Sequence, residues 1–341
     1  MLFDKQMEII GVHAEGEVGR VIFNGGPDIP GSSMSEKMDY INTVNDELLR
    51  FALYEPRGAA QMTINLLTSP ISPGAQMGFI PIQADGAHAM SGSNAMCVAT
   101  ALLETNVLEM TEPQTIVRLD TPAGLINATA YCKNRKVERV EVDMPQSFVE
   151  HLNHPIDVPG VGKMEVDVAF GGCYFVLIDA AKLGFSIQPH EARDLVEMGA
   201  KIKDAANAQI TVQHPEIESC NVIEYPMFVG RKGPDIVNAT IIFPGRLDRS
   251  PCGTGTAARL AVMHARGEVQ TGDVINVRSI VGSEFRAEVT SIGSWGTRSF
   301  INPKISGRSW IFSKQTIGIH PTDIFPLGYT LSDTWGTGKP R

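Results

Sequence analysis

The sequence predicts an α/β protein of two similar domains, each with an apolar helix buried at its centre. Three observations lead to this prediction: the length of the chain, an order of expected elements that occurs twice, and two related motifs that each precede an apolar helix. The chain has 341 residues, which is enough for two domains that each bury a full core.

The composition is that of a globular protein, with 43% hydrophobic and 20% charged residues. The net charge of −9 argues against nucleic acid or an anionic membrane surface as the main partner, although a helix terminus could still bind a small anion. The charged N-terminal stretch predicts no secretion signal, and no apolar run is long enough for a membrane span. We therefore expect a cytoplasmic protein that acts on a small molecule.

The five cysteines are odd in number, scattered and without a Cys-x-x-Cys pair. This pattern predicts reduced thiols, with neither a disulfide framework nor a zinc site. Four of them are expected to be buried small hydrophobic residues, namely Cys97, Cys132, Cys173 and Cys220. Cys252 differs because it immediately precedes an expected helix.

The elements expected in the first half begin with two strands between residues 7 and 23, joined by a glycine-containing turn. One helix is expected over residues 33–52, with Ser33 as its N-cap. Five strands are expected to follow, near residues 63–67, 77–83, 116–119, 125–130 and 137–144.

A stretch rich in proline and glycine, from Pro155 to Gly162, is the best candidate for the domain boundary. It predicts a first domain over residues 1–155 and a second over 156–314, with the C-terminal segment 315–341 joined to the first. The second domain repeats the order of strands, one amphipathic helix, more strands and an apolar helix. From residue 305 onward the chain is expected to be irregular, anchored by Trp310 and Trp335.

Two short stretches carry the internal repeat. One runs from Met90 through Ser91 into an apolar helix ending near residue 104, and the other from Pro251 through Cys252 into one ending near 265. In each, a small nucleophilic side chain is followed by glycine and a hydroxyl residue. Asn106 and Gly267 each stand fifteen residues beyond Ser91 and Cys252, and both residue types suit a left-handed helix C-cap. The match at both ends predicts a duplicated fold.

If the two domains face each other, both helix N-termini point at one cleft, where their free N–H groups and positive dipole ends would bind a carboxylate. Ser91 and Cys252 would then flank one carbon from opposite sides and exchange protons with it. A helix N-terminus also lowers a thiol pKa, so Cys252 is expected to be a thiolate base. The alternative is that the Gly-Thr-Gly-Thr loop is only a tight turn; it lacks the Gly-Lys-Ser/Thr ending of a nucleotide-binding loop.

The stretch from Asp248 to Thr256 resembles the second active-site motif of the proline racemase family, and Met90 to Ser93 is similar to the first, which is usually Met-Cys-Gly-His. Further stretches that resemble family landmarks are 13–17, 55–58, 121–124, 170–172 and 328–335. The resemblance implies a fold like that of diaminopimelate epimerase, cofactor-free chemistry at the α-carbon of proline or hydroxyproline, and a homodimer.

One departure decides the reaction that we expect. Ser91 stands where racemases of this family have a second cysteine, and a hydroxyl is a poorer base than a thiol. Family members of this kind resemble trans-3-hydroxy-L-proline dehydratases, so we expect dehydration of that substrate, with 4-hydroxyproline 2-epimerisation as a second activity. The alternatives are a 4-hydroxyproline 2-epimerase or proline racemase with little lyase activity, and a binding protein without turnover.

The resemblance also assigns roles to residues. Cys252 is the chemically preferred acid or base, whereas related dehydratases would give removal of the α-proton to Ser91, and this alternative stays open. The resemblance places four residues at the substrate carboxylate through backbone N–H groups, namely Gly92, Ser93, Gly253 and Thr254. Asp248 would accept from the substrate ammonium, or only cap its own loop. Phe243 would line the apolar side of the pocket, or only pack in the core.

Overall fold

The computed structural model describes residues 3–217 and 220–336, and the chain divides into two compact units. The first unit contains the chain up to Val142 together with the chain from Gly307 onward, and the second contains Asp143–Ser306. The expected boundary at residues 155–162 therefore falls inside the second unit. Proline and glycine stand there because they form the end and the turn of a hairpin, in which Pro155 pairs with Glu165.

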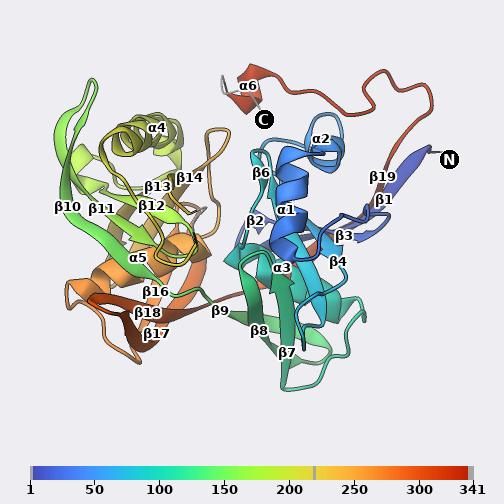
Figure 1. Ribbon diagram of the computed structural model, residues 1–341, viewed down its shortest axis with the longest axis horizontal. Coiled ribbons are helices and arrows are strands. Elements are labelled where there is room, and N and C mark those ends of the chain that lie inside the picture. Colours follow the sequence, from blue (N-terminus) through green and yellow to red (C-terminus); the bar gives the residue numbers. More distant parts are fainter. Residues whose placement is uncertain (1–2, 218–219, 337–341) are drawn as a thin grey trace. The chain divides into compact units, whose positions relative to one another are not determined.

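The first unit packs its strands around α3 (Figure 1). Its helices are α1 (Met34–Thr43), α2 (Glu47–Leu53), α3 (Gly92–Glu104) and α6 (Ser332–Trp335). Its strands are β1 (Lys5–Ala14), β2 (Glu17–Val18), β3 (Arg20–Asn24), β4 (Ile64–Thr68), β5 (Met77–Gln83), β6 (Gly86–Ala87), β7 (Gln114–Thr121), β8 (Gly124–Lys133), β9 (Lys136–Asp143) and β19 (Ser309–Ile319). Every residue of α3 from Gly92 to Leu103 is buried, because strands β1, β3, β8 and β19 all contact the helix.

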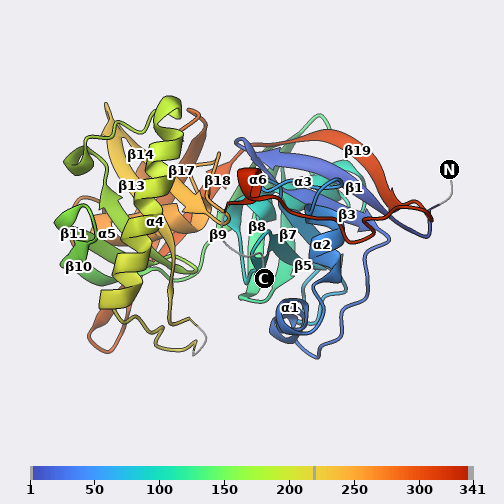
Figure 2. The same cartoon turned by 90° about the horizontal axis from the view of Figure 1, so that it is seen from above.

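Two expectations for this unit were wrong. The helix expected over residues 33–52 is two helices, α1 and α2, because the chain leaves the helix at an exposed Val44 and the Asn45 side chain accepts a hydrogen bond from the Glu47 N–H. Ser33 caps α1 as expected, at 3.1 Å from the Glu36 nitrogen. The segment after residue 305 is not irregular at first: β19 pairs antiparallel with the whole of β1 (Figure 2), a partner that no local pattern reveals.

The second unit holds one sheet between two helices. Its strands are β10 (Phe148–Val158), β11 (Gly162–Phe170), β12 (Tyr174–Asp179), β13 (Ile223–Lys232), β14 (Asp235–Ile242), β15 (Arg246–Leu247), β16 (Val274–Ser279), β17 (Glu284–Trp295) and β18 (Arg298–Gly307). Its helices are α4 (Ala192–Gln209) and α5 (Gly253–Ala265), with short 3-10 helices at Ala181–Leu183 and Pro189–Glu191.

Successive residues of β13 show why this sheet is buried on both faces. Met227 packs with Cys252 and Ala258 at α5, whereas the next residue, Phe228, packs in the cluster that contains Ile202 of α4. Successive side chains of a strand point to opposite faces of the sheet, so both faces of β13 are covered by apolar residues. The start of α5 therefore packs against an apolar face of this sheet.

The two central helices end as the repeat predicts. Asn106 follows α3 with a φ of 59°, and Gly267 follows α5 with a φ of 72°. Both residues therefore have the left-handed backbone conformation that terminates a helix. Within the described residues, no helix combines the length and the apolar character needed to cross a membrane.

The C-terminal segment is attached to the first unit by Trp335, of which only 1% is exposed. Its Nε1 donates to Glu55 Oε1 at 3.0 Å, and its ring meets the edge of Tyr54 with centroids 5.2 Å apart. Arg57 supports the same segment by donating to the carbonyls of Phe325 and Pro326. Residues 337–341 of the expected tail lie outside the described residues.

We expect Trp335→Ala to weaken this attachment by about 3–5 kcal/mol, the usual loss for a buried tryptophan. Hydrogen exchange of a peptide covering residues 320–336 should accelerate accordingly. The exchange rate of Trp335→Phe should lie between those of the unchanged protein and Trp335→Ala. Trp310, 42% of which is exposed, is a matched control, and its replacement by alanine should leave that exchange almost unchanged. Equal exchange in Trp335→Ala and the unchanged protein would contradict the anchoring role.

Candidate active site

Ser91 lies immediately before α3, in extended conformation with a φ of −150° and a ψ of 122°. Its backbone carbonyl accepts the first helical hydrogen bond, from the Ala95 N–H at 2.9 Å. Its side chain does not cap the helix; instead Oγ accepts from Asn94 Nδ2 at 2.9 Å. The hydroxyl is half-buried, and Gly92 and Ser93 follow it as the first buried residues of the helix. The serine motif therefore stands at a helix N-terminus, as predicted.

Cys252 occupies the corresponding place before α5, but with a φ of 63° that residues other than glycine seldom adopt. Hydrogen bonds hold the peptide groups on both sides of it. The Cys252 N–H donates to Ser250 Oγ at 3.1 Å, and its carbonyl accepts from the Thr256 N–H at 2.8 Å. The carbonyl of Pro251 accepts from Asn238 Nδ2 and from Thr256 Oγ1, both at 3.1 Å. The surrounding structure thus maintains a strained backbone at the thiol.

The thiol of Cys252 differs from the expectation of a thiolate. Its Sγ accepts from the Gly255 N–H at 3.4 Å and lies 3.8 Å from Thr254 Oγ1, contacts that favour the thiolate. Burial outweighs them, and with the negative charge of Asp248 it raises the pKa of Cys252 to about 12. The sulfur is therefore a protonated thiol at neutral pH, and the expected lowering of its pKa by the helix N-terminus was wrong.

We expect the pH dependence of Cys252 alkylation to report this raised pKa. Only the thiolate reacts with iodoacetamide, so the rate of Cys252 alkylation follows the thiolate fraction. Because pH 7.5 to 9.5 lies well below the pKa, this rate should rise about tenfold per pH unit in that range. Peptide mass spectrometry can follow Cys252 by itself, with glutathione as a reference whose rate levels off near pH 9. A rate for Cys252 that is already constant at pH 7.5 would show that the thiol is ionised there.

The structure brings four predicted residues together in the second unit: Cys252, Gly253, Thr254 and Asp248. Asp248 is buried, and its Oδ1 accepts from the Ser250 N–H at 2.8 Å, so it does cap its own loop beside the thiol. Phe243 follows the last residue of β14 in a turn and is half-buried, so it is not an ordinary residue inside a core strand. Ser91, Gly92 and Ser93 form the other group, in the first unit.

Some residues that build the cysteine site were missed. Gly171 and Gly172 lie against the start of α5: a Cβ on Gly171 would be 2.2 Å from the Thr254 carbonyl oxygen, and one on Gly172 would be 2.9 Å from Thr254 Cγ2. Gly255 is required for a similar reason, since a Cβ there would lie 3.0 Å from Cys252 Sγ. Gly171 and Gly172 lie in the family landmark 170–172, but their contact with α5 joins residues about 80 positions apart in the sequence, so no local pattern reveals it.

Asn238 and Arg259 form a buried network behind Cys252. Arg259 Nη1 donates to Asn238 Oδ1 at 2.7 Å, so the amide nitrogen of Asn238 is directed to Pro251 and Thr256. The same guanidinium donates to the carbonyls of Val237 and Gly230. A polar residue in the apolar strand and an arginine in the apolar helix were the sequence signals that could have revealed this network.

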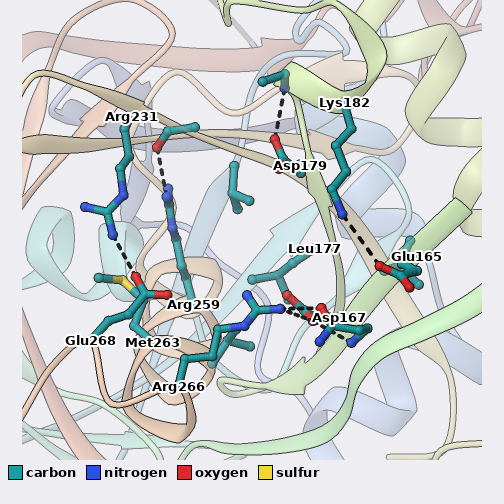
Figure 3. Close-up of a pocket in the computed structure, with 16 residues that line it drawn as sticks. Glu165, Asp167, Leu177, Asp179, Lys182, Arg231, Arg259, Met263, Arg266 and Glu268 are labelled. Atoms are coloured by element: carbon teal, nitrogen blue, oxygen red, sulfur yellow. Dashed lines mark hydrogen bonds and ion pairs between the residues drawn. The ribbon is translucent and has the colours of Figure 1, made fainter.

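A charged cavity of about 470 Å³ lies toward the other end of α5 (Figure 3). Ion pairs join the opposite charges that line it: Arg231 with Glu268 at 2.7 Å, Arg266 with Asp167 at 2.8 Å, and Lys182 with Glu165 at 3.7 Å. These groups neutralise one another. Cys252 precedes the N-terminus of α5, whereas the cavity borders residues 259–268, so the cavity is separate from the cysteine site.

Comparisons with known proteins show the family of the chain. Residues 9–330 match the sequence profile of the proline racemase family. The chain is 42% identical to a 4-hydroxyproline 2-epimerase of Rhizobium etli over 339 residues, and 40% identical to one of Agrobacterium fabrum over 340 residues. These alignments cover 98% of this chain and 98% of each relative. The chain belongs to the proline racemase family.

A solved structure extends the likeness to three dimensions. A hydroxyproline epimerase from Agrobacterium vitis, with bound trans-4-hydroxy-L-proline, is 39% identical and superimposes with a TM-score of 0.93. The match covers 99% of this chain and 99% of that one. The protein therefore has the α/β fold of this family.

The comparisons also correct the expected reaction. The two relatives above are named 4-hydroxyproline 2-epimerases and the solved structure a hydroxyproline epimerase, which favours the alternative activity over dehydration of trans-3-hydroxy-L-proline. The expected dehydration followed from the weak basicity of an isolated serine hydroxyl. In the folded protein Ser91 Oγ accepts a hydrogen bond from the buried side chain of Asn94.

Proposed function

We propose that this protein is a 4-hydroxyproline 2-epimerase, which interconverts trans-4-hydroxy-L-proline and cis-4-hydroxy-D-proline. The observation that carries the proposal is the pair of unequal acid–base groups at matching positions, Ser91 before α3 and Cys252 before α5, in a chain about 40% identical to such epimerases. Inversion at one carbon needs a proton removed from one face and another delivered to the opposite face. A serine and a cysteine supply one group for each face.

The helix N-termini would stabilise the intermediate. The N–H groups of a first helical turn have no partner within the helix and carry the positive end of its dipole. In this proposal those of Gly92, Ser93, Gly253 and Thr254 bind the substrate carboxylate, where negative charge grows when the α-proton leaves. Asp248 accepts from the ring ammonium, and Phe243 lines the apolar side of the ring. The reaction then consists of two proton transfers.

The thiol with its raised pKa fits this scheme as the acid in one direction. Protonated Cys252 delivers a proton to the α-carbon after the opposite face has lost one. In the reverse direction it must give up its own proton first, and a bound substrate ammonium beside the sulfur would favour the thiolate electrostatically. Ser91 performs the complementary step.

We also propose that the two units descend from one duplicated domain. Three matches between them support this: helices α3 and α5 have 13 residues each, both are buried, and each is followed by a left-handed residue.

The homodimer implied by the family resemblance remains a separate proposal, which size-exclusion chromatography with light scattering would test.

The decisive experiment incubates the purified protein with trans-4-hydroxy-L-proline and follows the cis-4-hydroxy-D-proline formed by chiral chromatography. Proline and trans-3-hydroxy-L-proline are assayed in parallel, because racemisation and dehydration are the competing reactions of this family. We expect 4-hydroxyproline to be the preferred substrate. Formation of a cyclic imine from trans-3-hydroxy-L-proline without any epimerisation of 4-hydroxyproline would overturn the proposal, and binding of pyrrole-2-carboxylate without turnover of any proline would indicate a binding protein.

A further inference from the structure

A chain of buried amides leads inward from Ser91. Asn94 Nδ2 donates to Ser91 Oγ at 2.9 Å, and Asn65 Nδ2, from β4, donates to Asn94 Oδ1 at 2.9 Å. Asn65 Nδ2 also lies 3.3 Å from the carbonyl oxygen of Arg20. Asn65 is fully buried and Asn94 is 2% exposed, although both stand among apolar residues. Neither amide takes part in the proton transfers proposed for Ser91 and Cys252.

The backbone carbonyl of Arg20 determines the orientation of the whole chain. A carbonyl oxygen only accepts, so the atom of Asn65 that faces it is the amide nitrogen. The second hydrogen of that nitrogen points to Asn94, whose facing atom must be the oxygen. The amide nitrogen of Asn94 therefore faces Ser91, and the hydroxyl oxygen must accept. Ser93 Oγ, at 3.4 Å, is a distant partner, so the Ser91 proton is left to point elsewhere.

The arrangement costs stability, which indicates a purpose other than packing. Asn65 Oδ1 is buried and has no hydrogen-bond partner among the described residues, a defect that costs about 1–3 kcal/mol. The backbone also leaves room for the amides: a Cβ on Gly19 would lie 2.5 Å from Asn94 Oδ1 and 3.2 Å from Asn65 Nδ2. A buried polar atom without a partner in a native protein calls for an explanation, and a role in catalysis is one of those known.

We propose that Asn94, held by Asn65, is a positioning residue that makes the Ser91 hydroxyl an efficient acid and base. Asn94 occupies the inner side of Oγ, so the O–H bond is directed to the substrate. When the serine proton moves to the α-carbon, the O–H bond breaks, a C–H bond forms, and Oγ keeps the electron pair. The Asn94 N–H then stabilises the negative oxygen, and the reverse transfer uses the same contact.

This inference rests on the proposed epimerase function and is tested by deuterium exchange measured separately on the two epimers. In a reaction with two acid–base groups, each group exchanges the α-proton of only one epimer. We expect Asn94→Ala to slow exchange of the epimer served by Ser91 about ten- to a hundredfold, the value of one hydrogen bond to a charged group. Exchange of the other epimer, served by Cys252, should stay within about threefold, because its proton transfer does not involve Asn94. Asn65→Ala should give a smaller loss on the same epimer.

A matched control is Thr100→Val on the same helix. Thr100 is fully buried and its Oγ1 lies 2.5 Å from Ser309 Oγ, so this variant also loses a buried hydrogen bond in α3, but away from Ser91. We expect both exchange rates to stay unchanged. In the Ser91→Cys background, Asn94→Ala should cost less than in the serine protein, since a thiolate needs less stabilisation than an alkoxide.

The outcomes separate the two proposals. If the unchanged protein neither epimerises 4-hydroxyproline nor exchanges its α-proton, the proposed function is wrong and this inference falls with it. If the unchanged protein is active but Asn94→Ala slows both epimers equally, or slows neither, only the positioning role is overturned. Should Asn94→Ala fail to fold, the Asn65→Ala variant and the Thr100→Val control decide by the same comparison.

Discussion

Replacing Cys252 with alanine is expected to lower epimerisation of 4-hydroxyproline by a factor of about 10³ or more, because one of the two proton transfers loses its acid and base. The loss should appear in kcat in both directions, since each direction passes once through the thiol. Chiral chromatography of the product measures it. The fold should persist, because the change removes one small side chain from the cluster that contains Met227 and Ala258.

Cys132→Ala is the matched control for the loss of a buried thiol. Cys132 is 4% exposed and Cys252 is 7% exposed, but Cys132 lies in β8 of the first unit, away from the start of α3. We expect it to epimerise at the unchanged rate. If Cys252→Ala retains more than about a tenth of the activity, the thiol is not an essential acid or base, and the proposed site is wrong.

Replacing Ser91 with alanine is expected to lower the rate of epimerisation by a similar factor, about 10² to 10⁴. Exchange of the α-proton for deuterium should persist at one of the two epimers. Cys252 can still remove and return the α-proton of that epimer, so deuterium enters without inversion. Ser91→Cys should retain turnover, because a thiol is the stronger acid and base at the same position. It should also raise the activity on proline, by restoring the two cysteines typical of the racemases that the family motif resembles.

Mass spectrometry of each epimer in deuterium oxide tests this asymmetry. Cys252→Ala provides the reciprocal control, since its remaining exchange should fall on the opposite epimer. Loss of exchange from both epimers in Ser91→Ala would mean that the serine acts in binding rather than in proton transfer. Full epimerisation by Ser91→Ala would mean that another group protonates that face.

The two motifs could be found in the sequence because their signals are local. In each motif the small residues, the apolar helix that they begin and the left-handed residue after it lie in one short segment of chain. These segments are Ser91 to Asn106 and Cys252 to Gly267. Such signals depend on backbone conformation and hydrophobic periodicity. The expectations that failed depended on distant partners: β19 forms a strand because β1 lies beside it, and residues 155–162 belong to a hairpin whose β11 continues into the sheet beneath α5.

Local patterns in the sequence are enough to find the side chains at the two helix N-termini and, through their motifs, the family of the protein. The chemical state of those side chains depends on the folded structure. Burial among residues of β12 and β13 makes Cys252 a protonated thiol, and Asn65 of β4 turns Asn94 toward Ser91. The pKa of a thiol and the direction of an O–H bond are set by the groups around them, and the fold brings those groups together from distant parts of the chain.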